Sequence, residues 1–149
     1  MIQRIQTLFL LNAIGFAIAF LFVPFGYMPV IDEVSGASVL QSMNAVDCIG
    51  AVIPTVIAVI LMLVSIFSFK NYSLQKLMAV LSAVAVLVAI AAVVYVIVSP
   101  YVCCDSDMSI ATEWGGGVLL AVASLLADFS AYHYICKDER LIKSYDRIR

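Results

Sequence analysis

Four long apolar runs constrain this chain more than any other feature of its sequence. Each is about twenty residues long, the length that an α-helix rising ~1.5 Å per residue needs to cross a ~30 Å hydrocarbon core. Hydrophobic residues make up 64% of the chain and charged residues only 12%, whereas a soluble domain carries about 25% charged residues. We therefore expect four membrane-spanning helices, at residues 5–23, 49–69, 77–98 and 115–135.

Two other interpretations of these runs fit the residues less well. A transmembrane β-strand alternates apolar and polar residues, and the stretch AVAVLVAIAAVVYVIV at residues 83–98 does not. A cleavable signal peptide would end near the small residues Ala17 and Ala19, but Phe20–Val23 extend the apolar run past them. We therefore expect the first run to be retained as a membrane span.

The charged residues are segregated along the chain. All eight basic residues lie near the N-terminus, between the second and third runs, or after the fourth run. The segments 24–48 and 99–114 carry acids and no base. By the positive-inside rule, the turn at 70–76, the tail at 136–149 and both termini face the cytoplasm. The sequence thus predicts one domain over residues 1–149, an all-α membrane protein with four transmembrane helices in an up-down-up-down bundle, and places 24–48 and 99–114 as outer loops.

Small residues recur at helical spacing in each run, and they predict the faces that meet inside the bundle. Lipid tails are as apolar as leucine, so membrane helices associate where small side chains let their backbones approach. The predicted faces are Asn12, Gly15 and Ala19 in the first run; Ala51, Thr55, Ala58 and Ser65 in the second; Ser82, Ala85, Ala89 and Ala92 in the third; and Gly117, Ala121, Ser124, Asp128 and Ala131 in the fourth.

Asp128 is the most informative polar residue because it lies inside the fourth run. An aspartate at the centre of a membrane helix costs about 2.5–3.5 kcal/mol, so it normally points into the bundle and finds a partner. Asn12, at a similar depth in the first run, is the natural candidate for that partner. The pair could lock the helices together or form part of a proton or ion relay. We favour the packing role, because a relay needs several ionisable groups in series and no other predicted span contains one.

Three cysteines lie in the predicted outer loops. Cys48 ends the first loop, and the vicinal pair Cys103–Cys104 lies in the second. In an oxidising periplasm we expect a structural disulfide between Cys48 and Cys103 or Cys104. The alternative is a periplasm-facing thiol oxidase that uses the same three cysteines, since four-span quinone-linked enzymes carry redox cysteines in outer loops. Those enzymes use a C-x-x-C motif, and its absence here favours the disulfide.

The tail KDERLIKSYDRIR, residues 137–149, has an amphipathic pattern. Apolar residues at three- and four-residue intervals predict a short helix with one apolar face. The charged residues on its other faces include Lys137, Asp138, Glu139, Arg140, Lys143, Asp146 and Arg147. We expect this helix to lie on the anionic inner leaflet. The alternative is that it docks onto a partner protein.

The two ends of the chain, MIQRIQTLFLL and KDERLIKSYDRIR, resemble a Bacteroidota family of small four-span inner-membrane proteins of unknown function, domain of unknown function 4293. The similarity is strongest at residues 1–11 and 137–149, while length and span pattern agree over the whole chain. The resemblance implies a multi-pass protein of the inner membrane of a Gram-negative cell, and it supplies no catalytic residues. It directs attention to the cytoplasmic face, where we expect the two ends to pack together, for example by Arg4 meeting an acid of the tail.

The residues favour a non-enzymatic role. The sequence contains no metal-ligand cluster, catalytic dyad or nucleotide-binding loop, so we expect no catalytic residue, metal or cofactor. No basic surface stripe points to nucleic acid. We therefore predict an accessory or structural subunit of a larger membrane assembly, in contact with the lipid bilayer and with a membrane-protein partner or further copies of itself. The main alternative is a small transporter or channel component that uses Asp128 with Asn12.

Overall fold

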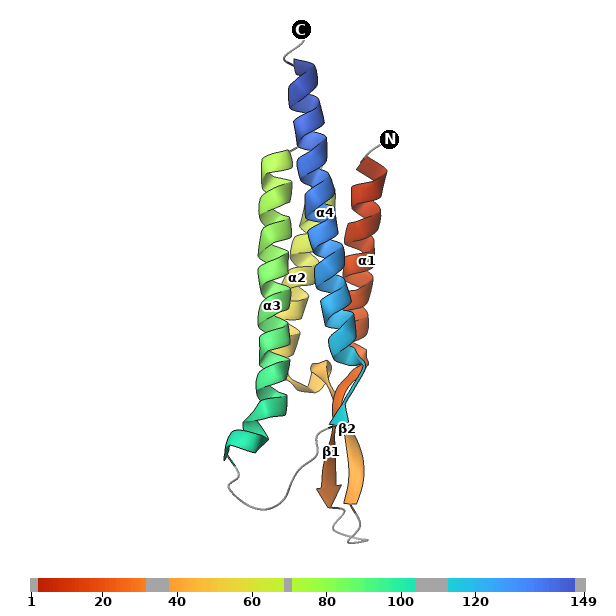
Figure 1. Ribbon diagram of the computed structural model, residues 1–149, viewed down its shortest axis with the longest axis vertical. Helices are drawn as coiled ribbons and strands as arrows, with labels where there is room; N and C mark the ends of the chain where they lie inside the picture. The colour runs from red at the N-terminus through yellow and green to blue at the C-terminus, as the bar shows by residue number, and fades with distance from the viewer. Residues whose placement is uncertain (1–2, 32–37, 69–70, 104–112, 147–149) are drawn as a thin grey trace.

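The structure, a computed structural model, describes residues 3–31, 38–68, 71–103 and 113–146, which form a four-helix bundle with a small sheet at one end (Figure 1). The helices are α1 (Gln3–Phe22), α2 (Ile49–Phe67), α3 (Tyr72–Cys103) and α4 (Gly117–Asp146). The other elements are the strands β1 (Pro24–Ile31), β2 (Ser38–Asn44) and β3 (Glu113–Trp114) and the 3-10 turn η1 (Ala45–Asp47). Helix α1 begins and helix α4 ends at the same end of the bundle, which is called here the termini end. The sheet lies at the opposite end, called the sheet end.

All four helices are long and apolar enough to cross a membrane. By length and composition, the candidate spans lie within Ile5–Phe22, Ile49–Phe67, Tyr72–Val98 and Gly117–Ile142. Large apolar side chains point outward from every helix; Phe22, Phe67 and Leu119, for example, are 70%, 78% and 72% exposed. So large an apolar surface is stable in hydrocarbon and not in water. The chain is therefore a multi-pass membrane protein, as predicted.

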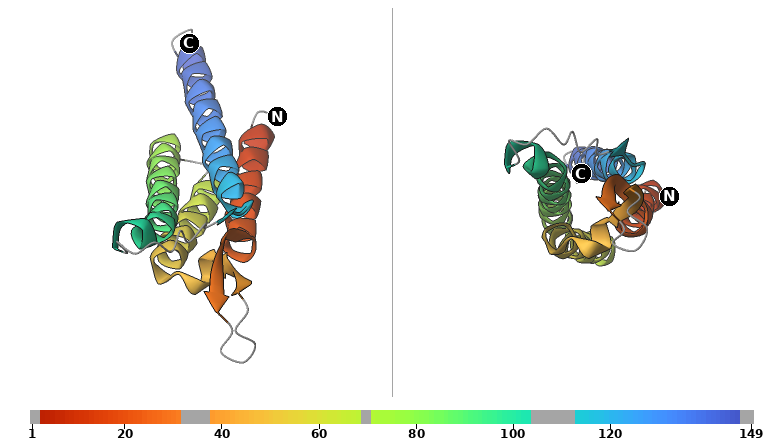
Figure 2. Two further views of the ribbon diagram at one scale, coloured as in Figure 1. Left: turned by 60° about the horizontal axis from the view of Figure 1, so that its bottom comes forward. Right: turned by 90° about the horizontal axis from the view of Figure 1, so that it is seen from below.

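The helices surround a common interior (Figure 2). Helix α1 packs chiefly against α4, and α2 packs chiefly against α3. One cluster of buried side chains, which includes Phe20, Phe25 and Val93, fills the interior near the sheet end. A second cluster, which includes Leu10 and Met62, fills the part nearer the termini. The predicted four-helix bundle is confirmed.

Side chains at alternating four- and three-residue steps are buried along the helices. In α2 they include Ala51, Thr55, Ala58 and Ser65, as predicted, and in α4 they are Ala121, Ser124, Asp128, Ala131, Ile135 and Asp138. The predicted face of α1 is wrong, because Asn12 and Gly15 are exposed. The buried residues of α1 are Gln6, Leu10, Ala13, Ile14, Ala17 and Phe20. The interior face of α1 therefore combines the large side chains Leu10, Ile14 and Phe20 with Ala13 and Ala17.

Two helices are longer than the sequence pattern suggests. Helix α3 begins at Tyr72 and continues to Cys103. The amphipathic tail is helical, as predicted, but it continues α4 to Asp146 along the same axis instead of forming a separate helix on the membrane surface (Figure 1). Residues 118–146 contain no glycine or proline, so no residue of that kind ends the helix at the predicted edge of the span.

The segment expected as the first outer loop contains a hairpin. Strand β1 pairs antiparallel with β2 on one side and with β3 on the other, giving the order β2-β1-β3. The backbone N–H of Gly115 donates to the Phe25 carbonyl oxygen at 2.8 Å. A Cβ on Gly117 would lie 2.6 Å from the Val23 carbonyl oxygen. The glycines therefore let the start of α4 pack closely against the start of β1.

Candidate functional site

Buried polar side chains gather in the half of the bundle nearer the termini. Because α4 buries every third or fourth residue, both of its acids at these positions, Asp128 and Asp138, point into the bundle; they are 1% and 5% exposed. The other helices contribute Gln6 from α1, Ser65 from α2, and Gln75 and Ser82 from α3, all similarly buried. These polar groups are the candidate functional site.

Asp128 is paired with Ser82 across the α3–α4 interface. The distance from Ser82 Oγ to Asp128 Oδ2 is 2.6 Å. Asn12, the partner expected from the sequence, is exposed on the outer face of α1. The prediction of an Asp128–Asn12 pair is therefore wrong. At that depth α1 instead contributes its backbone, since Ser124 Oγ donates to the Ala13 carbonyl oxygen at 2.9 Å.

The surroundings of Ser82 fit a neutral Asp128. Ser82 Oγ lies 2.6 Å from Asp128 Oδ2 and 2.9 Å from the Ala79 carbonyl oxygen, and a hydroxyl group has only one proton to donate. If Asp128 carries a proton, it donates to Ser82 Oγ, and Ser82 donates to Ala79. Both short contacts are then hydrogen bonds. No cation among the described residues pairs with Asp128, which also suits the neutral acid.

A second group of polar side chains lies nearer the termini and is called here the polar layer: Gln6, Ser65, Gln75 and Asp138. Gln6 Nε2 donates to Asp138 Oδ2 and, at 3.4 Å, to the Tyr134 carbonyl oxygen. Ser65 Oγ donates to the Gln75 carbonyl oxygen at 3.3 Å. Each of the four helices thus supplies one buried polar side chain to the polar layer.

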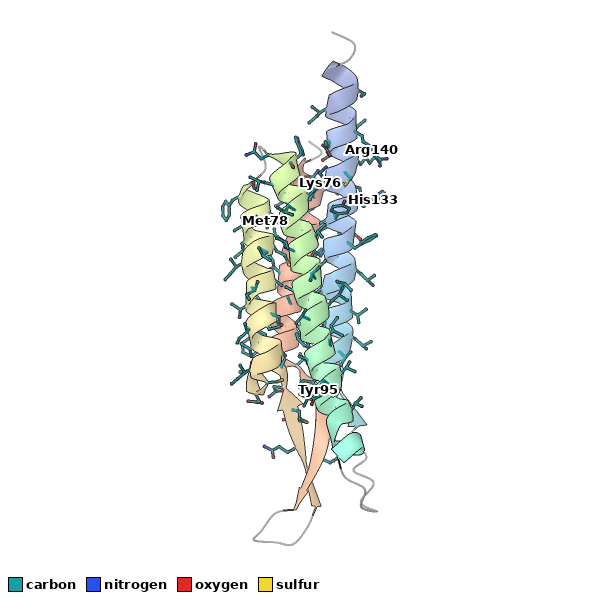
Figure 3. All side chains as sticks on the ribbon, turned by 90° about the vertical axis from the view of Figure 1, so that its left-hand side faces the viewer. Lys76, Met78, Tyr95, His133 and Arg140 are labelled. Carbon is teal, nitrogen blue, oxygen red and sulfur yellow. The ribbon has the colours of Figure 1, made fainter. Side chains whose placement is uncertain are left out.

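An ion pair between α3 and α4 lies next to the polar layer in the sequence. Lys76 Nζ lies 2.6 Å from Glu139 Oε2, and the two side chains are 28% and 21% exposed. Gln75 and Asp138 each precede one member of the pair, and both are buried in the half of the bundle nearer the termini. Figure 3 shows Lys76 at the termini end of α3, with Arg140 of α4 nearby. Counting ten residues at ~1.5 Å each, Asp138 stands roughly 15 Å from Asp128 along α4.

Three buried oxygens in this site have no hydrogen-bond partner among the described residues. They are Gln75 Oε1, Asp128 Oδ1 and Asp138 Oδ1. All three are acceptors, so they can be satisfied by protons, by water or by a cation. No group of three or more metal-ligating side chains of the His, Cys, Asp or Glu type occurs in the described ranges. The site is thus suited to protons, water or a single small cation.

The remaining predicted surface residues divide into those on α4 and those outside the described side chains. Lys137 and Arg140 are exposed, whereas Asp138 is buried and Glu139 is paired with Lys76. The side chains of Arg4, Lys143 and Asp146, and the whole of Arg147, lie outside the described residues.

The two ends of the chain pack together, as expected. The predicted Arg4 contact lies outside the described side chains, and the observed contacts come from other residues. Gln6 reaches Asp138, and the ring of Phe9 stacks on that of Tyr134 with centroids 5.2 Å apart. An amide and an aromatic ring of α1 therefore hold this part of α4.

The cysteine predictions are only partly covered by the described residues. Cys48 is a free thiol at the start of α2. The side chain of Cys103 and the whole of Cys104 lie outside the described residues. With Cys48 free, the predicted disulfide is not formed in this structure, and the thiol-oxidase alternative stays a prediction.

Sequence reasoning missed the polar layer, although the signal is present. The four-three spacing of the predicted α4 face continues from Ala131 to Ile135 and Asp138. On α3, Gln75 lies seven residues before Ser82, two helical turns away on the same face. Extending both series past the predicted ends of the spans would have placed Asp138 and Gln75 inside the bundle.

Comparison with known families gives one match. Residues 2–148 match the family described as a domain of unknown function, DUF4293. The chain belongs to this family. The match covers all four spans and the full length of α4, so the DUF4293 unit includes both the membrane bundle and the helical tail. No curated protein matches the chain.

Proposed function

We propose that this DUF4293 protein is a non-enzymatic accessory or structural subunit of a larger assembly in the bacterial inner membrane. Its termini end faces the cytoplasm in this proposal. The positive-inside rule supports that orientation, since Lys76, Lys137 and Arg140 all lie at the termini end. The sheet end, where η1 carries Asp47 and β3 carries Glu113, then lies on the periplasmic side.

The observation that carries the proposal is the extension of α4 beyond the other helices (Figure 1). Leu141 and Ile142 on this extension are 39% and 43% exposed. They lie just beyond the Lys76–Glu139 ion pair, next to the exposed Arg140. A rigid helix that presents two aliphatic side chains beside a cation suits docking into an apolar groove with an acidic rim.

Copurification in a mild detergent tests this role. We expect the native-level protein to carry a stoichiometric membrane partner. The double variant Leu141→Asp with Ile142→Asp should lose that partner, because two carboxylates replace the aliphatic contact. Ser144→Ala, an exposed change on the same extension, should keep it. Purification of the wild-type protein without a partner, or retention of the partner by the aspartate variant, would contradict the proposal.

A second candidate function, a small transporter or channel component, is favoured by Asp138. A relay needs several ionisable groups in series, which Asp128 alone does not provide. Asp138 supplies a second acid, and Gln75 Oε1, also buried in this half of the bundle, has no hydrogen-bond partner among the described residues. Proteoliposomes with an internal pH-sensitive dye test this function. Proton flux that is lost in both Asp128→Asn and Asp138→Asn would support it, and wild-type vesicles no leakier than empty ones would exclude proton transport.

A further inference from the structure

Asn12 occupies an unusual position for a polar residue. It lies near the middle of the span Ile5–Phe22, and its side chain is exposed on the outer face of α1. No side-chain hydrogen bond joins Asn12 to another helix within the described part of the chain. An amide that faces hydrocarbon lacks the hydrogen bonds that water would give it. Its neighbours on that surface, Leu8, Leu11 and Ile18, are apolar and suited to lipid.

The backbone beside Asn12 is open to close approach. Gly15 lies one turn further along the same face, and a Cβ placed there would meet nothing within 4 Å. Ala19 continues the face after another turn, so a path of small side chains runs away from the amide. Membrane helices that cross at small residues bring interhelical hydrogen-bonding side chains within reach.

We propose that the face formed by Asn12, Gly15 and Ala19 binds the same face of a second copy of this chain. A carboxamide is self-complementary, because its NH₂ group donates to the oxygen of an identical amide and its own oxygen accepts in return. Two copies inserted in the same orientation, related by a two-fold axis along the membrane normal, hold Asn12 at the same depth. Each Asn12 therefore lies opposite Asn12 of the other copy. The rest of the bundle is unaffected, since Asn12 takes no part in the polar layer or the Asp128–Ser82 pair.

Energy transfer between donor- and acceptor-labelled full-length chains in liposomes tests the pairing. We expect transfer that falls as lipid is added, as for a reversible dimer. Asn12→Leu should weaken association by about tenfold, the effect of one interhelical amide interaction. Gly15→Ile should also weaken it, because the branched side chain separates the backbones. Asn12→Gln, which keeps the amide, should restore most of the association.

The matched control is Leu87→Ala on α3, a change at a lipid-facing side chain that is 51% exposed. It should leave the transfer unchanged. The proposal is overturned if the wild-type chain shows no lipid-dependent transfer, if Asn12→Leu associates as the wild type does, or if Leu87→Ala weakens association equally. Helical content measured by circular dichroism confirms that each variant compared is folded.

Discussion

Ser82 and Asp128 meet inside the bundle with 2.6 Å between Oγ and Oδ2, and this contact joins α3 to α4. At this depth the described residues that α1 buries in the interior are apolar. The arrangement gives Asp128 a structural partner on the neighbouring helix. It also makes the charge state of Asp128 part of the packing, because Ser82 has a second acceptor, the Ala79 carbonyl oxygen.

The first prediction concerns this pair. Asp128→Asn should change stability little, because an amide can donate to Ser82 Oγ as a neutral carboxylic acid does. Ser82→Ala should lower the free energy of unfolding by about 1 kcal/mol, since a buried polar group loses its partner. Thermal unfolding in detergent measures both. An Asp128→Asn variant destabilised as much as Asp128→Ala would show that the negative charge itself is required.

Gln6 provides a second test, at the contact between the chain ends. Gln6→Leu should destabilise the protein by about 1–3 kcal/mol, because Asp138 then remains buried without its donor. The matched control is Gln41→Leu on β2, where the side chain is exposed. Equal melting temperatures for the two variants would contradict a stabilising Gln6–Asp138 contact.

The ion pair between Lys76 and Glu139 should contribute little by comparison. Both side chains keep access to solvent, at 28% and 21% exposure, and exposed pairs contribute about 0.2–1 kcal/mol. Lys76→Gln should therefore shift the melting temperature only slightly, and about 1 M salt should remove the difference by screening. Lys137→Gln, at an exposed lysine on α4, serves as the control. A large, salt-independent loss of stability on changing Lys76 would contradict a small contribution from this ion pair.

The glycines at the start of α4 give a sharply matched comparison. Gly117→Ala should destabilise the protein by about 1–3 kcal/mol, because its Cβ would press against the Val23 carbonyl oxygen. Gly116→Ala should be close to neutral, since a Cβ there meets nothing within 4 Å. If the two alanine variants have the same melting temperature, the close approach of α4 to β1 does not stabilise the fold.

The helices could be predicted from the sequence because run length and hydropathy are set by membrane thickness. The interior face of α1 could not, because size alone does not decide which side of a membrane helix is buried. Leu10 and Phe20 fill the interior, while Asn12 and Gly15, chosen for small size, face outward. In α4 the rule succeeded, since its small residues and Asp128 share one stripe.

The sheet could not be predicted from the sequence, because the residues of its strands do not form a typical strand pattern. Gly26 and Pro29 interrupt the apolar pattern of β1, and both residue types are depleted in strands. The pairing instead depends on long-range contacts, from β1 to β2 and to β3 far along the chain. No local pattern records those contacts.

Cysteine labelling in intact cells tests the central claim, a four-span bundle with its termini end in the cytoplasm, most directly. In a chain whose four native cysteines are replaced by serine, Ser42→Cys on β2 and Ser73→Cys at the start of α3 both place a thiol at an exposed position, at opposite ends of the bundle. A membrane-impermeant maleimide should label the first in intact cells and the second only after the membrane is permeabilised. Labelling of Ser73→Cys in intact cells, or equal labelling of both, would contradict the account.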